Sequence, residues 1–225
     1  HYQPGNYKTL FYLAFLPGIM AVFASSFLKE KNRISDGNKK PVSIFSFLHY
    51  WKESPGAYKR LVAGLLVFTL FNSSDVFLLL KAKEAGLDDT AVIGIYIFYN
   101  LVYALFAFPI GMVADKIGLK AIFMTGLVLF SMVYFGMAIN TDLYIFFILF
   151  FLYGIYAAAT EGISKAWISN ITDRKDTATA IGTFSGLQSI CTLIASTLTG
   201  LIWFQFGATS AFRLTALITL VVLVY

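Results

Sequence analysis

The stretch TAVIGIYIFYNLVYALFAFPIGMVA, Thr90 to Ala114, contains no charged residue. It is longer than the roughly 20 helical residues that cross a hydrocarbon core of about 30 Å. Because lipid cannot satisfy an exposed backbone, and because the run lacks the period-two alternation of a barrel strand, it predicts a transmembrane helix. Four more stretches without charge support this interpretation: Leu10 to Leu28, Ala121 to Thr141, Leu143 to Thr160 and Thr177 to Phe212.

The composition of the whole chain agrees with this interpretation. The 225 residues have a mean hydropathy of +0.74, and 58% of them are hydrophobic whereas only 13% are charged. These values exclude an ordinary soluble domain. We therefore expect an all-α fold, a polytopic membrane helical bundle that has the lipid bilayer as its surroundings.

Seven spans are predicted. The long uncharged run that begins at Thr177 is too long for one crossing, and turn residues between Gln205 and Ser210 divide it. The seventh span is still apolar at Tyr225, and the chain begins with His1, so we expect a piece of a longer protein. The spans are residues 10–28, 60–81, 90–109, 120–139, 143–164, 177–204 and 210–225.

The basic residues predict the orientation of these spans. With alternate ends assigned to opposite sides, one side holds only Lys8, Lys81, Lys83 and Arg213, and the other holds the remaining 13 of the 17 Lys and Arg residues. The positive-inside rule places the richer side in the cytoplasm. The net charge of +5 thus reflects topology, and no basic groove with stacking aromatics suggests a nucleic acid partner.

Residues 29–59 form the one long connection. It begins polar and basic, and then becomes aromatic between Ile44 and Trp51, which is typical of a short helix lying in the membrane interface. A disordered linker with some apolar residues is the alternative. We interpret 1–28 as the last helix of an N-terminal half, 29–59 as a central cytoplasmic loop, and 60–225 as a six-helix C-terminal half with a truncated last helix.

The sequence has no enzyme signature. Its one cysteine, Cys191, excludes an internal disulfide, and its two histidines, His1 and His49, do not cluster. We find no glycine-rich phosphate loop and no nucleophile motif. We therefore expect no catalytic activity, no metal and no cofactor.

The loop GMVADKIGLK, residues 111–120, is the most informative motif. Its turn glycine, acid and bases predict a tight cytoplasmic hairpin, in which Asp115 can cap a neighbouring helix and the bases can pair with acidic helix ends. The pattern resembles the G-x-x-x-D-[RK]-x-G-[RK]-[RK] loop of the major facilitator superfamily of transporters, although Leu119 replaces a base. The matching residues are Gly111, Asp115, Lys116, Gly118 and Lys120, which the resemblance assigns to a gating loop.

A second match follows at residues 177–182, TATAIG, which is similar to the R-G-T-A-x-G end of a later loop in that family, with Thr177 and Ala178 in place of the arginine and first glycine. By this resemblance the chain is the last seven of twelve helices. It implies alternating access between two six-helix halves around a central site for a small-molecule substrate. The N-terminal half of the same protein is then a partner.

In that family the first and fourth helices of each half line the pathway, and here they are the spans 60–81 and 143–164. These two spans carry the acids Asp75 and Glu161. Asp75 follows Asn72 and lies about 7 Å from the span's centre, toward the outside. A carboxylate at that depth faces a cavity, pairs or carries protons. The alternative is a structural acid that binds local hydroxyls and helix ends.

Other polar groups complete the candidate pathway. On the third span, spacings of three, four and seven residues place a polar stripe on one helical face: Tyr96, Tyr99, Asn100 and Tyr103. A similar stripe on the fifth span consists of Tyr153, Tyr156 and Thr160. Such stripes also occur as simple packing surfaces. Glu161 and Lys165, four residues apart, predict an ion pair near the cytoplasmic face, which we interpret as structural or gating.

The leading functional hypothesis is therefore a secondary transporter of a small solute, with protons as the candidate coupling ion. Import and efflux fit equally well. A seven-helix receptor or retinal protein is an alternative, but residues 210–225 contain no Schiff-base lysine. A non-transporting sensor or scaffold on the same fold is another. The expected location is the cell membrane, specifically a bacterial inner membrane.

Overall fold

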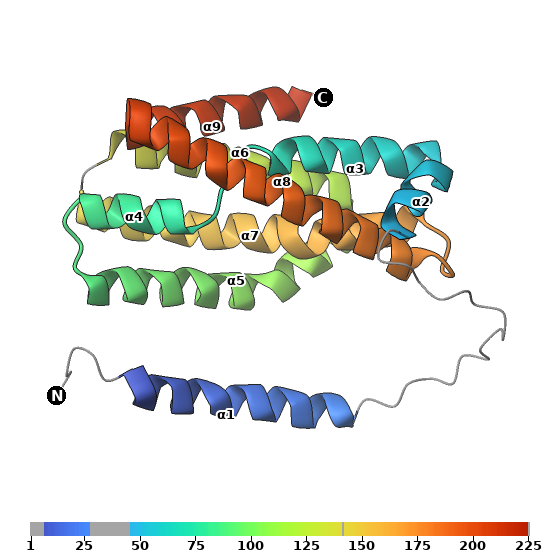
Figure 1. Cartoon of the computed structure of the whole chain (residues 1–225), viewed down its shortest axis with the longest axis horizontal. Helices are drawn as coiled ribbons and strands as arrows, with labels where there is room; N and C mark the ends of the chain where they lie inside the picture. The colour runs from blue at the N-terminus through green and yellow to red at the C-terminus, as the bar shows by residue number, and fades with distance from the viewer. Residues whose placement is uncertain (1–6, 28–45, 141, 225) are drawn as a thin grey trace. The chain divides into compact units, whose positions relative to one another are not determined.

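The computed structural model describes residues 7–27, 46–140 and 142–224. In these ranges every regular element is a helix, as predicted (Figure 1). The helices are α1 (Tyr7–Ser26), α2 (Ser46–Glu53), α3 (Gly56–Thr69), α4 (Val76–Glu84), α5 (Asp89–Ile117), α6 (Leu119–Ile139), α7 (Leu143–Ile171), α8 (Thr177–Phe206) and α9 (Ala208–Val224).

The chain divides into two compact units, residues 1–42 and 43–225. The first unit contains α1, which corresponds to the first predicted span. The second contains α2 to α9. Residues 28–45, which include most of the polar part of the predicted central loop, lie outside the described residues.

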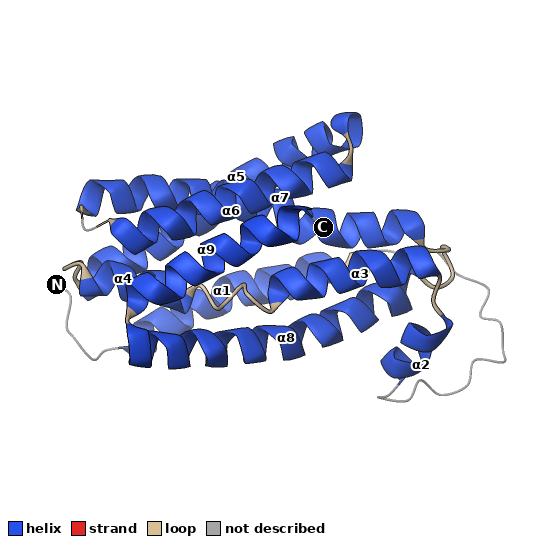
Figure 2. Cartoon of the chain, turned by 90° about the horizontal axis from the view of Figure 1, so that it is seen from above, coloured by secondary structure: helices blue, strands red, loops and turns tan. Residues whose placement is uncertain are grey.

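Helix α7 is central to the second unit. It packs extensively against α5 and α6, and α6 packs on its other side against α9. The long helices run roughly parallel to one another in both views (Figure 1 and Figure 2). Four of them, α5 to α8, are long and apolar enough to cross a membrane, and α9 is a shorter apolar helix. The second unit therefore has the architecture of a multi-pass membrane bundle.

Glycines allow these helices to approach closely. A Cβ atom added at Gly154 of α7 would lie 2.8 Å from the backbone oxygen of Tyr99 and 2.8 Å from the side chain of Val102, both on α5. At Gly126 of α6 it would lie 2.6 Å from Cγ2 of Thr160 on α7. Small residues at such crossings are the usual means by which membrane helices gain packing contacts.

The predicted span 60–81 is wrong as a single helix. The structure has two helices there, α3 and α4, separated by residues 70–75, which are not helical. The two helices do not share one continuous axis (Figure 1). The interruption coincides with the polar residues Asn72 to Asp75, whose side chains compete with the backbone for hydrogen bonds and disfavour a helix interior. The chain from 56 to 84 thus provides a discontinuous helix.

Two other predicted spans are longer in the structure. The span 90–109 becomes α5, which continues past Pro109 to Ile117. The span 143–164 becomes α7, which continues to Ile171. Both helices extend through charged residues that the hydropathy-based boundaries excluded. A tight turn at Gly118 separates α5 from α6, and its φ of 102° is a conformation that favours glycine.

Helix α2 packs against two helices of the second unit, α8 and α3. It contacts α8, and its Tyr50 ring lies edge-on to Tyr58 of α3 with centroids 5.3 Å apart. The buried hydroxyl of Tyr58 donates a 2.8 Å hydrogen bond to the backbone oxygen of Ala180 on α8. The short helix predicted between residues 29 and 59 is therefore present and is tied to α3 and α8.

Candidate functional site

The interruption between α3 and α4 brings backbone polar groups into the bundle. The amides of Leu70, Phe71 and Asn72 still bond to carbonyls of the last turn of α3. The amide of Ser74 instead finds its acceptor on another helix. It donates a 3.2 Å hydrogen bond to Oγ of Ser196 on α8. Broken helices in membrane proteins are tolerated where other groups re-satisfy the backbone or where they line a cavity.

Asp75 is the residue immediately before α4. Its two carboxylate oxygens accept hydrogen bonds from two different helices: Oδ2 from the hydroxyl of Tyr99 on α5, and Oδ1 from the hydroxyl of Tyr153 on α7, the latter at 2.5 Å. An arrangement in which both oxygens accept is the one expected for an ionised carboxylate. The positive end of the α4 helix dipole also favours a negative charge there.

A second polar connection lies next to this one. Nδ2 of Asn72 donates a 2.9 Å hydrogen bond to the hydroxyl of Tyr156 on α7. Thr160, one turn farther along α7, donates through its hydroxyl to the backbone oxygen of Tyr156 at 2.9 Å. The interrupted segment therefore contacts α7 through two separate tyrosines, Tyr153 and Tyr156.

Some buried polar atoms near the interruption have no partner. Among the described residues, four buried side-chain polar atoms make no hydrogen bond, and two of them are Oδ1 of Asn72 and Oγ of Ser73. An unsatisfied buried polar group costs about 1–3 kcal/mol. Such groups concentrate where function requires a local arrangement that is not the most stable one.

A cavity of about 300 Å³ lies beside the interruption and is lined by Asn72, by Asp75 and by residues of α3, α5, α6, α7 and α8. Of the seven predicted pathway residues, six line it: Asn72, Asp75, Tyr99, Tyr156, Thr160 and Glu161. Asn100 does not, and its side chain instead donates to the backbone oxygen of Tyr96. The structure thus brings most of the predicted residues together around one cavity, from residues 70–75, α5 and α7.

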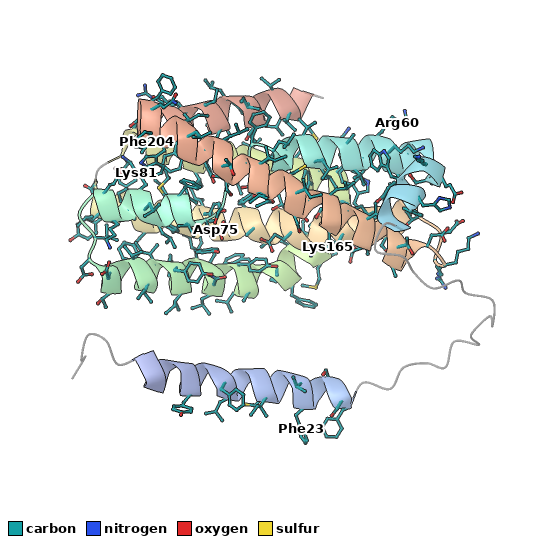
Figure 3. All side chains as sticks on the ribbon, in the orientation of Figure 1. Phe23, Arg60, Asp75, Lys81, Lys165 and Phe204 are labelled. Carbon is teal, nitrogen blue, oxygen red and sulfur yellow. The ribbon has the colours of Figure 1, made fainter. Side chains whose placement is uncertain are left out.

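The predicted ion pair is not formed. Glu161 and Lys165 both line the cavity, yet they are not within 4.0 Å of each other among the ion pairs of the described residues. Both side chains are exposed in the second unit. Asp75 lies at the gap between α3 and α4, whereas Lys165 lies on α7, away from that gap (Figure 3). The cavity therefore carries two acids and one base at different levels.

Several residues that line the cavity were not among the predicted site residues, and Tyr153 and Gln188 are two of them. Tyr153 belonged to the recognised stripe on α7, but nothing in that stripe indicated that its hydroxyl binds Asp75. Gln188 of α8 also lines the cavity. An amide in the middle of a long uncharged span is a signal that could have identified it.

The predicted gating loop has the expected hairpin geometry at its centre. Gly118 ends α5 and precedes α6. Gly111 lies inside α5, and Asp115, Lys116 and Lys120 are exposed. Asp115 makes no side-chain hydrogen bond or ion pair with any described residue, so the predicted helix cap is not seen here. It borders a cavity of about 330 Å³ together with Gly111.

The described part of the chain contains no group of three or more His, Cys, Asp or Glu side chains that could hold a metal ion. The cavity combines the carboxylates of Asp75 and Glu161 with the amine of Lys165, several hydroxyls, and the amides of Asn72 and Gln188. Such a set binds and orients polar ligands, and its carboxylates can gain or lose a proton.

Comparison with known proteins agrees with this architecture. The family model described as "Major Facilitator Superfamily" matches residues 61–225, which is well over half of the chain. The chain is also similar to an uncharacterised MFS-type transporter of Methanocaldococcus jannaschii, with 31% identity over 208 residues. That alignment covers 90% of this chain and 51% of the relative, so the chain spans about half the length of the curated relative it matches. The chain therefore belongs to the major facilitator superfamily.

Proposed function

We propose that the protein is a secondary active transporter of a small solute, and that residues 60–225 form its C-terminal six-helix half. The family match over residues 61–225 and the MFS-type relative support membrane transport. Residues 1–28 then provide the last helix of an N-terminal half, and residues 29–59 the central loop. Alternating access moves the two halves about a site between them.

We further propose that the transport is coupled to protons through Asp75. The observation that carries this proposal is the position of its carboxylate, beside a helix interruption, on the wall of the cavity and bound by Tyr99 and Tyr153. An ionisable group within a membrane domain is costly and is retained mainly where it pairs, binds or moves protons. Protonation replaces one acceptor oxygen with a donor, and so weakens at least one of the two tyrosine contacts.

Protonation of Asp75 would alter contacts that involve three helices. Asp75 precedes α4, Tyr99 lies on α5 and Tyr153 on α7. Releasing a tyrosine removes one of the contacts that hold the start of α4 against α5 or α7, and α4 is joined to α3 only by the non-helical residues 70–75. Proton binding would thus change how α4 is held against its neighbours. Coupling requires such a difference between the protonated and the unprotonated states.

The remaining cavity residues are suited to contact the solute. Tyr156 and Thr160 supply hydroxyls and aromatic surface, and Glu161 and Lys165 supply opposite charges toward the predicted cytoplasmic end. We assign Glu161 and Lys165 a gating role, in which they form their ion pair in a conformation other than this one. The gating loop from Gly111 to Lys120 is assigned to the same conformational change.

The test is transport by the full-length protein in proteoliposomes, with and without a pH gradient, over a panel of drugs, sugars and organic acids. We expect one class of solute to move against its concentration only when the gradient is present. If the correctly folded protein moves no solute of any class, the transporter proposal is wrong and the sensor or scaffold alternative takes its place. The family membership already argues against a seven-helix receptor.

A further inference from the structure

A second large cavity lies away from Asp75. It has a volume of about 560 Å³ and is lined by residues of α3, α6, α7 and α9. Its walls are mainly apolar, with side chains that include Leu61, Met124, Leu127 and Val222. We call this space the α3–α9 groove.

The groove has a basic rim. Arg60 and Lys120 both line it, both are exposed, and neither forms an ion pair with a described residue. Arg60 lies near the start of α3, far from the interruption that contains Asp75 (Figure 3). Both residues are at the end of the bundle that the positive-inside rule assigns to the cytoplasm. The rim is therefore positively charged at the predicted headgroup level.

An aromatic residue indicates the same depth. Trp167 of α7 lines the groove, is partly buried, and packs edge-on against Phe123 with ring centroids 6.2 Å apart. Tryptophan is enriched at the boundary between hydrocarbon and headgroups, where one end of the ring is apolar and the other wet. The groove thus has a basic rim at the level of a lipid headgroup, a tryptophan at the boundary with the hydrocarbon, and an apolar floor at the level of the acyl chains.

We propose that the α3–α9 groove binds an anionic phospholipid of the cytoplasmic leaflet. The phosphate group lies between Arg60 and Lys120, and an acyl chain follows the apolar floor along Leu61 and Leu127. Basic pockets between transmembrane helices on the cytoplasmic side bind acidic headgroups by this combination of charge and apolar contact. In a zwitterionic lipid the headgroup's own cation offsets the charge of the phosphate and weakens its attraction to Arg60 and Lys120, and a soluble anion would leave the apolar floor exposed.

The groove adjoins the cavity that contains Asp75. Leu65 and Phe123 line both spaces, so two side chains form a shared wall. A lipid in the groove packs against the outer side of this wall. Its binding does not depend on the proposed transport activity, because the groove's residues do not include Asp75 or the tyrosines that bind it.

The test measures lipid binding to the purified full-length protein by native mass spectrometry, with phosphatidylglycerol and phosphatidylcholine titrated separately. We expect phosphatidylglycerol to bind more tightly. The double substitution Arg60→Gln with Lys120→Gln should weaken phosphatidylglycerol binding about 30-fold, with little effect on phosphatidylcholine. This factor corresponds to the loss of about 1 kcal/mol of electrostatic attraction for each of the two basic residues. Ala57→Phe, which adds a ring at the exposed edge of the groove, should weaken both lipids.

The matched control is Lys52→Gln with Lys175→Gln, which removes two exposed cations from the same predicted side but outside the groove. It should change phosphatidylglycerol binding by no more than about two- to threefold. Equal effects of the two double variants, or equal affinity for both lipids, would overturn the proposal. The proposal would also be overturned if the full-length protein bound no phosphatidylglycerol, since this would mean that other parts of the protein occupy the groove.

Discussion

The hydroxyl of Tyr153 donates a 2.5 Å hydrogen bond to Oδ1 of Asp75, which joins the middle of α7 to the start of α4. The two residues are 78 positions apart in the sequence. Together with the hydroxyl of Tyr99, Tyr153 holds a carboxylate at a helix interruption inside the bundle. The two contacts therefore connect the start of α4 to α5 and to α7.

Replacing Tyr153 by phenylalanine removes one of the two hydroxyls that donate to Asp75 and leaves this partly buried carboxylate with one side-chain donor. A hydrogen bond to a charged group is worth about 1.5–3 kcal/mol, so the midpoint of thermal unfolding of the purified protein should fall. Tyr144→Phe is the matched control, because Tyr144 lies on the same helix with 83% of its surface exposed. Equal unfolding midpoints for the two variants would contradict a stabilising hydrogen bond between Tyr153 and Asp75.

Gly154→Ala tests the approach of α5 to α7 that places Tyr99 beside Asp75. The added Cβ would lie 2.8 Å from the backbone oxygen of Tyr99, which cannot move without shifting α5. We expect a loss of about 1–3 kcal/mol of stability, as for other overpacked sites. Gly162→Ala, on the same helix with open space around the glycine, should unfold like the parent protein. If the two variants behave alike, the crossing is not as close as described.

Tyr50, which lies outside the membrane-spanning helices, gives a prediction for alkaline pH. Burial, followed by the negative charges of Asp176 and Asp173, raises the pKa of the Tyr50 phenol from its ordinary value of 10.0. Because the folded-state pKa is the higher one, the stabilisation is complete below about pH 10 and is lost as the pH rises through the folded pKa. The attachment of α2 should therefore weaken in that range.

The measurement is the ultraviolet absorbance of tyrosinate during a pH titration, taken as the difference between the parent protein and Tyr50→Phe. Asp176→Asn should lower the pKa of Tyr50 toward its ordinary value, because it removes a neighbouring negative charge. Asp89→Asn, at the opposite end of the bundle, should not change it. A titration of Tyr50 that is unaffected by Asp176→Asn would contradict the assigned cause.

Much of the fold could be predicted from the sequence, because uncharged runs of sufficient length have few alternatives in a membrane. The helices α6 and α8 differ from the predicted spans 120–139 and 177–204 by only one or two residues at their ends. The ends of α5 and α7 were less predictable, since hydropathy marks where apolar residues stop and not where the helix stops. Both helices continue through charged turns that the hydrocarbon does not cover.

The interruption at residues 70–75 was not predicted, although Asn, Ser and Asp are residues that favour turns and helix starts. What makes it stable comes from distant parts of the chain: Oγ of Ser196 for the amide of Ser74, and the tyrosine hydroxyls for Asp75. Hydropathy patterns contain no information about such contacts. For the same reason the sequence identified Asp75 and Tyr99 as candidates but did not indicate that one binds the other.

The most direct test of proton coupling through Asp75 compares two assays on the full-length protein carrying Asp75→Asn, once its solute is known. Accumulation driven by a pH gradient should be lost, whereas exchange of labelled for unlabelled solute across the same membrane should continue, because exchange needs no net proton movement. Asp89→Asn, which removes an exposed acid paired with Lys83, should leave both assays unchanged. Gradient-driven accumulation by Asp75→Asn at the parent rate would contradict the account.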